Sequence, residues 1–204
     1  MTDNDQPLDA DALRASQFSS ISSGLNGALD SLEATARKRQ RLSFSFMLFL
    51  ILNVVDQFTK QLARTHLSTF TEESYFGGWV RLHHSENPGA FLSLGAQLGA
   101  QMRLTIFTIL VCAFLIWATW MLIKKAANAN WAFVIGWALL ISGGFGNVID
   151  RVWKSTVTDF MVMGQGSLQT GVFNVADMAI MFGIIVVLIW GRETTQRETI
   201  GFKR

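Results

Sequence analysis

The sequence predicts an all-α membrane protein, a bundle of four transmembrane helices with a small β-rich segment on the outer, periplasmic side between the first and second spans. Three observations lead to this fold class. Half of the 204 residues are hydrophobic, and the mean hydropathy is positive at +0.31. Long apolar runs carry almost no charge, and basic residues gather at their edges. The net charge of +2 is too small to indicate a nucleic-acid partner.

Four runs are long enough to cross a bilayer, because about 20 helical residues span roughly 30 Å. Residues 104–123 and 131–149 contain no acidic or basic side chain. Residues 44–63 are largely apolar at first, and their charged side chains fall towards the C-terminal end. Residues 172–190 carry polar groups only in their first turns. We therefore expect one membrane domain over residues 44–191.

Clusters of basic residues set the expected orientation. One lies just before the first span at residues 37–41, a second follows the second span at 124–125, and a third follows the fourth span within 192–204. Lys and Arg are enriched on the cytoplasmic side of membrane proteins. Both termini are therefore expected in the cytoplasm, and residues 64–103 and 150–171 are expected outside.

The segments between and before the spans differ in character. Residues 1–43 are polar and rich in Ser, Asp and Ala, which predicts a largely disordered cytoplasmic extension with a short helix over 25–39. They lack the basic head and apolar middle of a signal peptide, so no cleavage is expected there. Residues 192–204 are expected to form a cytoplasmic tail. The outer segment 64–103 contains β-favouring and aromatic residues among glycines, which favours a small sheet on the membrane surface.

Polar residues converge on the outward-facing ends of the spans and on the loop between the third and fourth spans. Two carboxylates held together share one proton, so the ionised member can accept a proton from water while the protonated member donates to a carbonyl. The spacing leaves open which two of three acids pair, and whether each acid only forms an ion pair with a neighbouring Lys or Arg. The converging residues are Asp56, Asn147, Asp150, Arg151, Asp159, Asn174 and Asp177, and the three acids are Asp150, Asp159 and Asp177.

Two other chemistries are weaker explanations. His83, His84 and Glu86 carry metal-ligating groups, but neighbouring histidines point to opposite sides of an extended segment and no further ligand has the required spacing. A serine–lysine peptidase would need Lys60 without its proton, whereas Asp56 one helical turn earlier keeps Lys60 charged. We therefore expect neither a metal nor another cofactor.

Five motifs in order give a more specific indication. Together they resemble the signature of the lipoprotein signal peptidase family, also called signal peptidase II, and they lie within residues 44–191. The motifs are DQFTK (Asp56–Lys60), NPGAFLS (Asn87–Ser93), GGFGNVIDR (Gly143–Arg151), VTDF (Val157–Phe160) and FNVAD (Phe173–Asp177).

The resemblance implies a membrane aspartic endopeptidase of the bacterial inner membrane, with its active site at the outer face and no metal. Such an enzyme removes signal peptides from diacylglyceryl-modified prolipoproteins, which reach it through the membrane lipid. Nothing in the sequence demands more than a monomer. The resemblance assigns the catalytic dyad to Asp159 and Asp177, substrate binding or dyad orientation to Asn147, Arg151, Asn174, Asn87 and Gly89, and structural support to Asp56, Lys60 and Asp150.

Two features limit the resemblance, and two other functions remain as alternatives. In the NPGAFLS motif the aromatic Phe91 comes one place earlier than usual, and Pro88 stiffens the loop. A proton-coupled small membrane transporter would use the same acids, but it predicts acids throughout the membrane depth and internal repeats. An inactive relative that only binds lipoproteins is the second alternative, and the intact Asp159 and Asp177 argue against it.

Overall fold

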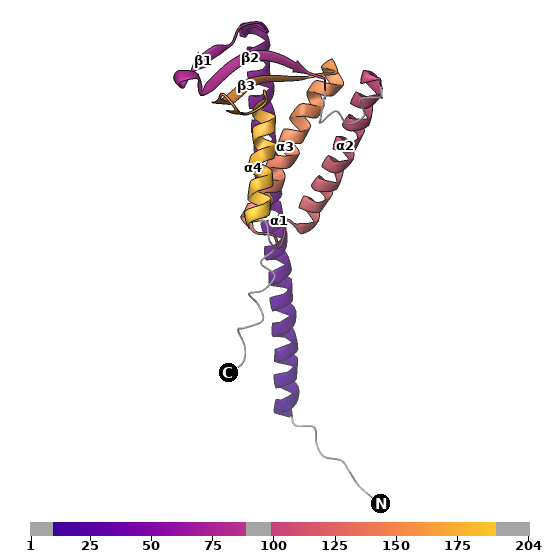
Figure 1. Ribbon diagram of the computed structural model, residues 1–204. Coiled ribbons are helices and arrows are strands. Elements are labelled where there is room, and N and C mark those ends of the chain that lie inside the picture. The colour runs from indigo at the N-terminus through magenta and orange to yellow at the C-terminus, as the bar shows by residue number, and fades with distance from the viewer. Residues whose placement is uncertain (1–9, 89–98, 191–204) are drawn as a thin grey trace, which may run out of the picture.

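The longest element is α1, a single helix of 57 residues from Ala10 to His66. It belongs to a computed structural model that describes residues 10–88 and 99–190. Figure 1 shows the C-terminal part of α1 inside a helical bundle and its N-terminal part extending far beyond the bundle. The helix is thus longer than the sequence predicts, and residues 10–24 are helical rather than disordered.

Two features of the chain favour a continuous helix. Residues 8–87 contain no proline, and extending an existing helix costs far less than nucleating a new one. Arg41 also fixes the helix where it leaves the bundle. Its guanidinium donates to the backbone oxygens of Ala126 and Ala127, at 2.7 and 2.8 Å, and lies 5.8 Å from the ring centroid of Trp131.

Three further helices complete the bundle: α2 (Ala100–Lys125), α3 (Trp131–Lys154) and α4 (Val175–Trp190). Helix α3 is central and packs against α1, α2 and α4. Glycines let the backbones of α3 and α4 touch, since a Cβ on Gly183 would lie 2.8 Å from the oxygen of Gly136. Such small-residue contacts are typical of helix pairs in membranes.

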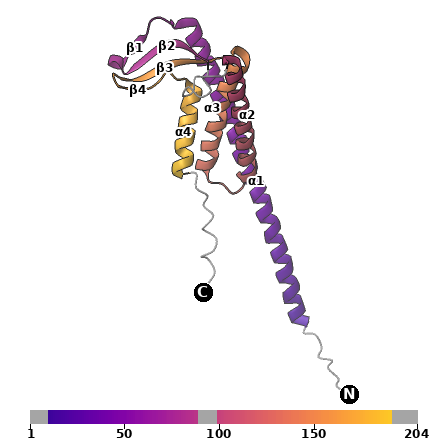
Figure 2. The ribbon, with the colours of Figure 1, turned by 45° about the vertical axis from the view of Figure 1, so that its right-hand side comes forward.

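A four-stranded antiparallel sheet covers one end of the bundle (Figure 2). The strands are ordered β1 (Glu73–Tyr75), β2 (Val80–Asn87), β3 (Val157–Gln165) and β4 (Leu168–Gln169). The sheet predicted within residues 64–103 is confirmed as β1 and β2. The segment between α3 and α4, expected to be a loop, instead supplies the other two strands.

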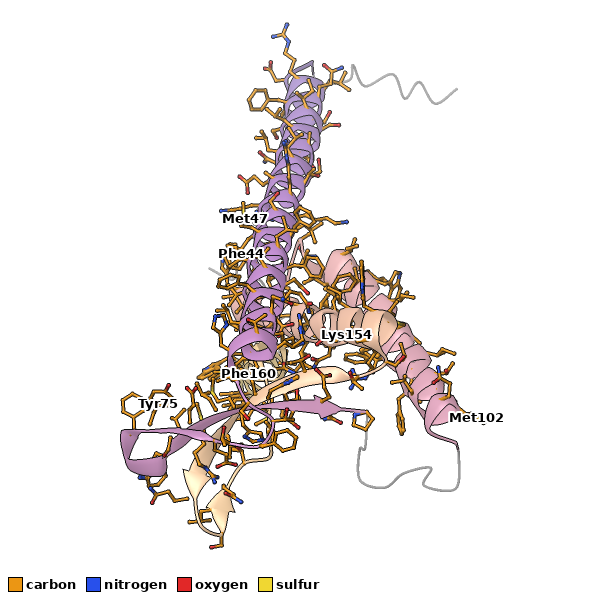
Figure 3. The ribbon with its side chains drawn as sticks, turned by 90° about the horizontal axis from the view of Figure 1, so that it is seen from above. Phe44, Met47, Tyr75, Met102, Lys154 and Phe160 are labelled. Atoms are coloured by element: carbon orange, nitrogen blue, oxygen red, sulfur yellow. The ribbon has the colours of Figure 1, made fainter. Side chains whose placement is uncertain are left out.

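The sheet reaches sideways from the bundle. In Figure 3, Phe160 of β3 lies close to the helices, whereas Tyr75 of β1 lies at the far end of the sheet. Phe160 is 7% exposed and Tyr75 is 45% exposed. The part of the sheet nearest the bundle is therefore the buried part.

Among the described residues, three helices are long and apolar enough to cross a membrane, namely α1, α2 and α3. Helix α4 is apolar but has 16 described residues, which corresponds to about 24 Å at the usual rise per residue. The fold is therefore that of a multi-pass membrane protein, mostly helical with a small antiparallel sheet.

Candidate active site

The site is built around the first turn of α4. Asn174 precedes this helix, and its side-chain oxygen accepts a hydrogen bond from the backbone N–H of Asp177 at 3.0 Å. In return, the Asp177 carboxylate accepts from the backbone N–H of Asn174 at 3.2 Å. This reciprocal arrangement is a capping box, which satisfies N–H groups that a helix start leaves unpaired.

A second acid reaches the same helix start from α1. The Asp56 carboxylate accepts from the backbone N–H of Ala176 at 2.9 Å. Gly146 of α3 makes room for it, because a Cβ at that position would lie 2.7 Å from an Asp56 oxygen. A negative charge is favourable near the N-terminus of a helix. Asp56 therefore holds α1, α3 and α4 together at the level of the site.

Asp159 comes to this point on β3. The backbone of Phe173 pairs with Met161 in both directions, at 2.9 and 3.0 Å, which draws the start of α4 against the strand. Asn174 consequently donates from its side-chain amide to the Asp159 carboxylate at 2.6 Å. Asp159 is 3% exposed, although the sequence placed it in a loop. Asn174 therefore contacts both Asp159 and Asp177 directly.

Asn147 of α3 extends the network. Its amide nitrogen donates to Asp177 at 2.8 Å, while its amide oxygen accepts from Lys60 at 3.0 Å and from Asn174 at 3.2 Å. An ammonium group can only donate, so Lys60 fixes which end of the Asn147 amide faces it. The NH₂ group of Asn147 is then left to face Asp177. Lys60 thereby orients the Asn147 amide, which donates directly to the Asp177 carboxylate.

Lys60 itself is fully buried and lies between two acids. Its ammonium nitrogen is 2.8 Å from an oxygen of Asp56 and 3.1 Å from an oxygen of Asp150. With Asn147 these acceptors account for the three donors of an ammonium group. Asp150 also accepts from the backbone N–H of Thr158, one residue before Asp159, at 3.2 Å. Asp150 therefore supports β3 from α3.

The proton affinity of Asp159 is unusual for an aspartate. Burial raises the pKa of its carboxyl to about 6, and the nearby Asp177 charge acts in the same direction. Hydrogen bonds from Asn87, at 3.1 Å, and from Asn174 oppose this rise. A carboxyl with this pKa is protonated about one tenth of the time at pH 7, roughly a hundred times more often than an ordinary aspartate.

Most of the residues singled out from the sequence come together here. Asp56, Lys60, Asn87, Asn147, Asp150, Asp159, Asn174 and Asp177 form one hydrogen-bonded network. Arg151 is half-buried, and its guanidinium is directed back to the backbone oxygen of Asn147 at 3.5 Å. Gly89 lies outside the described residues.

No sequence pattern indicates a role for Thr158, and Glu86 stands out in the sequence only as a possible metal ligand. The Thr158 hydroxyl donates to Glu86 at 3.0 Å and accepts from Arg64 and Lys154 at 3.0 and 2.8 Å. Glu86 and Thr158 face each other across β2 and β3, one residue away from Asn87 and Asp159. The pairing register of β2 with β3 brings these two residues together, and this register cannot be read from the sequence alone.

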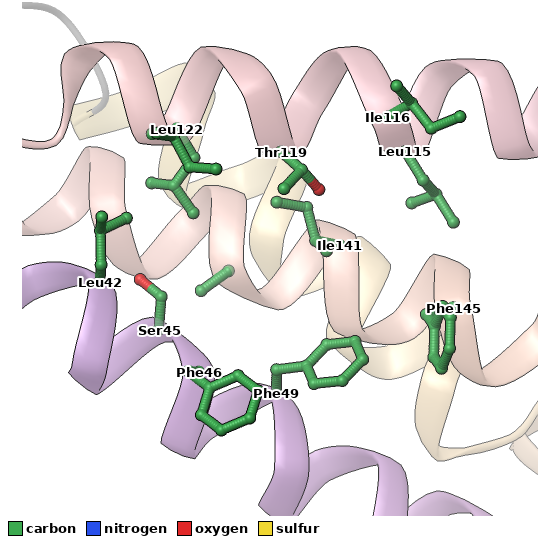
Figure 4. A pocket seen from close by; sticks show the side chains of 12 residues that line it. Leu42, Ser45, Phe46, Phe49, Leu115, Ile116, Thr119, Leu122, Ile141 and Phe145 are labelled. Carbon is green, nitrogen blue, oxygen red and sulfur yellow. The ribbon is translucent and has the colours of Figure 1, made fainter.

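A separate apolar pocket of about 600 Å³ lies between α1, α2 and α3. Figure 4 shows its side chains converging from the three helices, with Ser45 and Thr119 as polar members of the lining. Such a lining suits a hydrocarbon chain or an apolar segment rather than a polar ligand. The labelled lining residues are Leu42, Ser45, Phe46, Phe49, Leu115, Ile116, Thr119, Leu122, Ile141 and Phe145.

The fold and the buried acidic network define a multi-pass membrane protein with a carboxylate-rich site at one end of its bundle. Comparison with known proteins narrows this class. The family model described as signal peptidase (SPase) II matches residues 48–191. The family resemblance found in the sequence motifs is thereby confirmed, and the chain belongs to the signal peptidase II family of membrane peptidases.

Individual relatives agree with the family model. A protein of Chlorobium phaeobacteroides named lipoprotein signal peptidase is 37% identical over 155 residues, covering 71% of this chain and 93% of its own. One of Borrelia hermsii with the same name is 31% identical over 79% of this chain and 96% of its own. A solved structure described as a bacterial membrane enzyme matches with a TM-score of 0.64 and 26% identity, over 72% of this chain and 91% of its own.

Proposed function

We propose that this protein is an aspartic endopeptidase that removes signal peptides from diacylglyceryl-modified prolipoproteins. The observation that carries the proposal is the pair of carboxylates, Asp159 and Asp177, joined through Asn174 in a chain of the signal peptidase II family. The alternative of a transporter is less well supported. Its acids would spread through the membrane depth, whereas Asp56, Asp150, Asp159 and Asp177 share one network.

In this proposal the dyad works with one shared proton. Asp159, with its pKa raised to about 6, is the member that carries the proton and donates to the scissile carbonyl. Asp177 takes a proton from the attacking water and passes it to the leaving amine as the C–N bond breaks. The collapsing tetrahedral intermediate returns the other proton to Asp159, which restores the dyad. Water attacks directly, so no covalent intermediate with the protein forms. Asn174 and Asn147 keep the two carboxylates in position.

The proposed topology has four spans, with α4 as the fourth, and both termini in the cytoplasm. Basic residues support this orientation, because Arg41 contacts the turn between α2 and α3 at one end of the bundle and the sheet lies at the other. The dyad then lies beneath the sheet at the outer face of the inner membrane. We propose residues 44–191 as the peptidase domain and the segments 1–43 and 192–204 as its cytoplasmic flanks.

The apolar pocket fits the same substrate class. A prolipoprotein is anchored by its lipid and by an apolar signal segment, so it approaches sideways through the membrane. The pocket between α1, α2 and α3 offers an apolar surface of about 600 Å³ for part of that segment. Asn87, at the end of β2, would meet the chain near the modified cysteine, since its amide donates to Asp159.

Cleavage of a lipidated proprotein by the purified protein in detergent tests the proposal. Asp159→Asn and Asp177→Asn should each lose at least about 100-fold in rate, the usual contribution of general acid–base catalysis. Asp30→Asn, on the exposed part of α1, is the matched control and should keep full rate. Full activity in both dyad variants would refute the mechanism. Equal cleavage of an unlipidated proprotein would refute the substrate class.

A further inference from the structure

The N-terminal part of α1 exposes an apolar stripe that the peptidase fold does not use. Phe18, Ile21, Leu25 and Leu32 are 76%, 70%, 58% and 66% exposed. The family match begins at residue 48, so the stripe lies before the matched region. Figures 1 and 2 both show this part of the helix extending away from the bundle. A stripe of large apolar side chains along an exposed helix is typical of a surface that binds another protein.

The spacing of the stripe identifies the kind of partner. Phe18, Leu25 and Leu32 are seven residues apart and occupy one heptad position, a. Ile21, Ala28 and Thr35 occupy the other seam position, d. Five of these six seam residues are apolar, and Thr35 at the end is the exception. A repeat of seven residues with apolar a and d positions is the pattern of a helix that packs along a second helix in a coiled coil.

Charges argue for a helix partner and against a membrane surface. Residues 10–36 contain three acids, Asp11, Asp30 and Glu33, and one base, Arg14. Helices that lie on anionic lipid carry Lys and Arg beside their apolar face. The basic cluster begins only at Arg37, where the seam ends. The stripe therefore has no electrostatic attraction to lipid headgroups along its length.

The membrane itself favours a second copy of the same chain. Because α1 is one continuous helix with a membrane-crossing part, two copies in one membrane present residues 10–36 on the same side, in the same direction and at the same height. This is the geometry of a parallel, in-register pair. The positions that flank such a seam carry no charge from Gln17 to Ala36, so identical helices meet no repulsion there.

The N-terminal part of α1 has low intrinsic helix stability. Residues 10–36 contain Gly24 and Gly27, each of which costs an exposed helix about 1 kcal/mol relative to Ala, together with several serines. Neither glycine has a neighbour within 4 Å in the described structure, so close packing within the chain does not explain them. Burying the seam against a partner would offset this weakness.

We propose that residues 18–35 of two copies of this chain pair as a parallel, in-register coiled coil on the cytoplasmic side of the membrane. The bundle of each copy keeps its own complete site, and the monomer expected from the sequence then describes the peptidase domain alone. The inference rests on the geometry of α1 and not on the proposed catalytic activity.

Cysteine cross-linking in membranes tests this arrangement. In a Cys112→Ala background, Leu25→Cys and Leu32→Cys place identical seam residues within the roughly 7 Å between Cα atoms that a disulfide permits. Ser23→Cys and Asp30→Cys, on the opposite face of the heptad, are the matched controls. We expect an oxidised dimer for the two seam variants and little for the controls. Equal cross-linking on both faces, or none at the seam, would overturn the proposal.

A second measurement separates loss of pairing from loss of folding. The double variant Leu25→Asp/Leu32→Asp should lower the mass of the full-length protein in mild detergent from dimer to monomer, whereas Ser23→Asp should leave the dimer intact. The proteolytic rate of both variants should equal that of the wild type, because the site lies at the other end of α1. A wild-type protein that is monomeric in both membranes and detergent would refute the second copy as the partner.

Discussion

The two ends of α1 differ in what they bury: the C-terminal end buries charged side chains, whereas the N-terminal part exposes apolar ones. Near its C-terminal end, Asp56 and Lys60 are 2% and 0% exposed, whereas in its N-terminal part Phe18 and Leu32 are 76% and 66% exposed. The buried charges are satisfied by partners on α3 and α4, and the exposed apolar side chains have no such partners among the described residues. Within this helix, a side chain is therefore buried where neighbouring elements provide partners for it, whatever its polarity.

The largest effect on stability is expected at the buried end. Lys60→Met would leave Asp56 and Asp150 without their shared cation, and removing one partner of a buried ion pair typically costs about 3–5 kcal/mol. The free energy of unfolding in detergent should fall by that amount. Lys154→Met is the matched control, since Lys154 is 27% exposed and should cost about 1 kcal/mol. Equal losses in the two variants would contradict the central role of Lys60.

The pH dependence of stability tests the burial of Asp159. Its pKa is about 6 in the folded protein and near 4 in an unfolded chain, so the folded state binds this proton more tightly. Its stabilising contribution is complete below about pH 4 and is lost as the pH rises through about 6. Relative to Asp159→Asn, the wild type should lose on the order of 2–3 kcal/mol between pH 4 and pH 7. Parallel stability curves for the two proteins would refute this.

The close packing of α3 on α4 predicts a smaller loss. A Cβ on Gly143 would lie 2.3 Å from the backbone oxygen of Ala176, a distance that no side-chain rotation relieves. Gly143→Ala should therefore destabilise the protein by about 1–3 kcal/mol through overpacking. It should also slow catalysis, because the displaced turn of α4 carries Asp177. Thermal unfolding and cleavage rate check both effects, and a neutral outcome in both would contradict the close contact.

A glycine-to-alanine substitution in the exposed part of α1 should instead increase stability. Nothing lies within 4 Å of a Cβ on Gly27, so Gly27→Ala should stabilise the local helix by up to about 1 kcal/mol. Limited proteolysis within residues 10–36 should slow by a factor of about five as the open form becomes rarer. Faster proteolysis of the variant would show that the helix does not form in solution.

The sequence was most informative where structure depends on local composition. The apolar runs at 104–123 and 131–149 correspond to α2 and α3, and the β-favouring outer segment contains β1 and β2. It was less informative where structure depends on distant pairing. The strand that carries Asp159 forms because β2 provides an antiparallel partner about 75 residues earlier, and no local pattern reveals that register.

The candidate site could likewise be predicted from the sequence only in part. The sequence placed several acids and amides at one end of the bundle, and family motifs selected among them. The contact of Asp56 with the start of α4 and the orientation of Asn147 by Lys60 depend on how three helices meet. Glu86 and Thr158 were missed because only the sheet brings them together. Such contacts require the tertiary structure.

The most direct test of the central claim asks whether Asp159 and Asp177 act as one unit. The cleavage rate of a lipidated proprotein should be measured for Asp159→Asn, Asp177→Asn and the double variant under identical conditions. Residues that share one proton and one task show strongly non-additive losses. The double variant is therefore expected to be about as slow as the slower single variant. Losses that multiply in the double variant would contradict a dyad with one shared proton, because they would mean that the two carboxylates act independently.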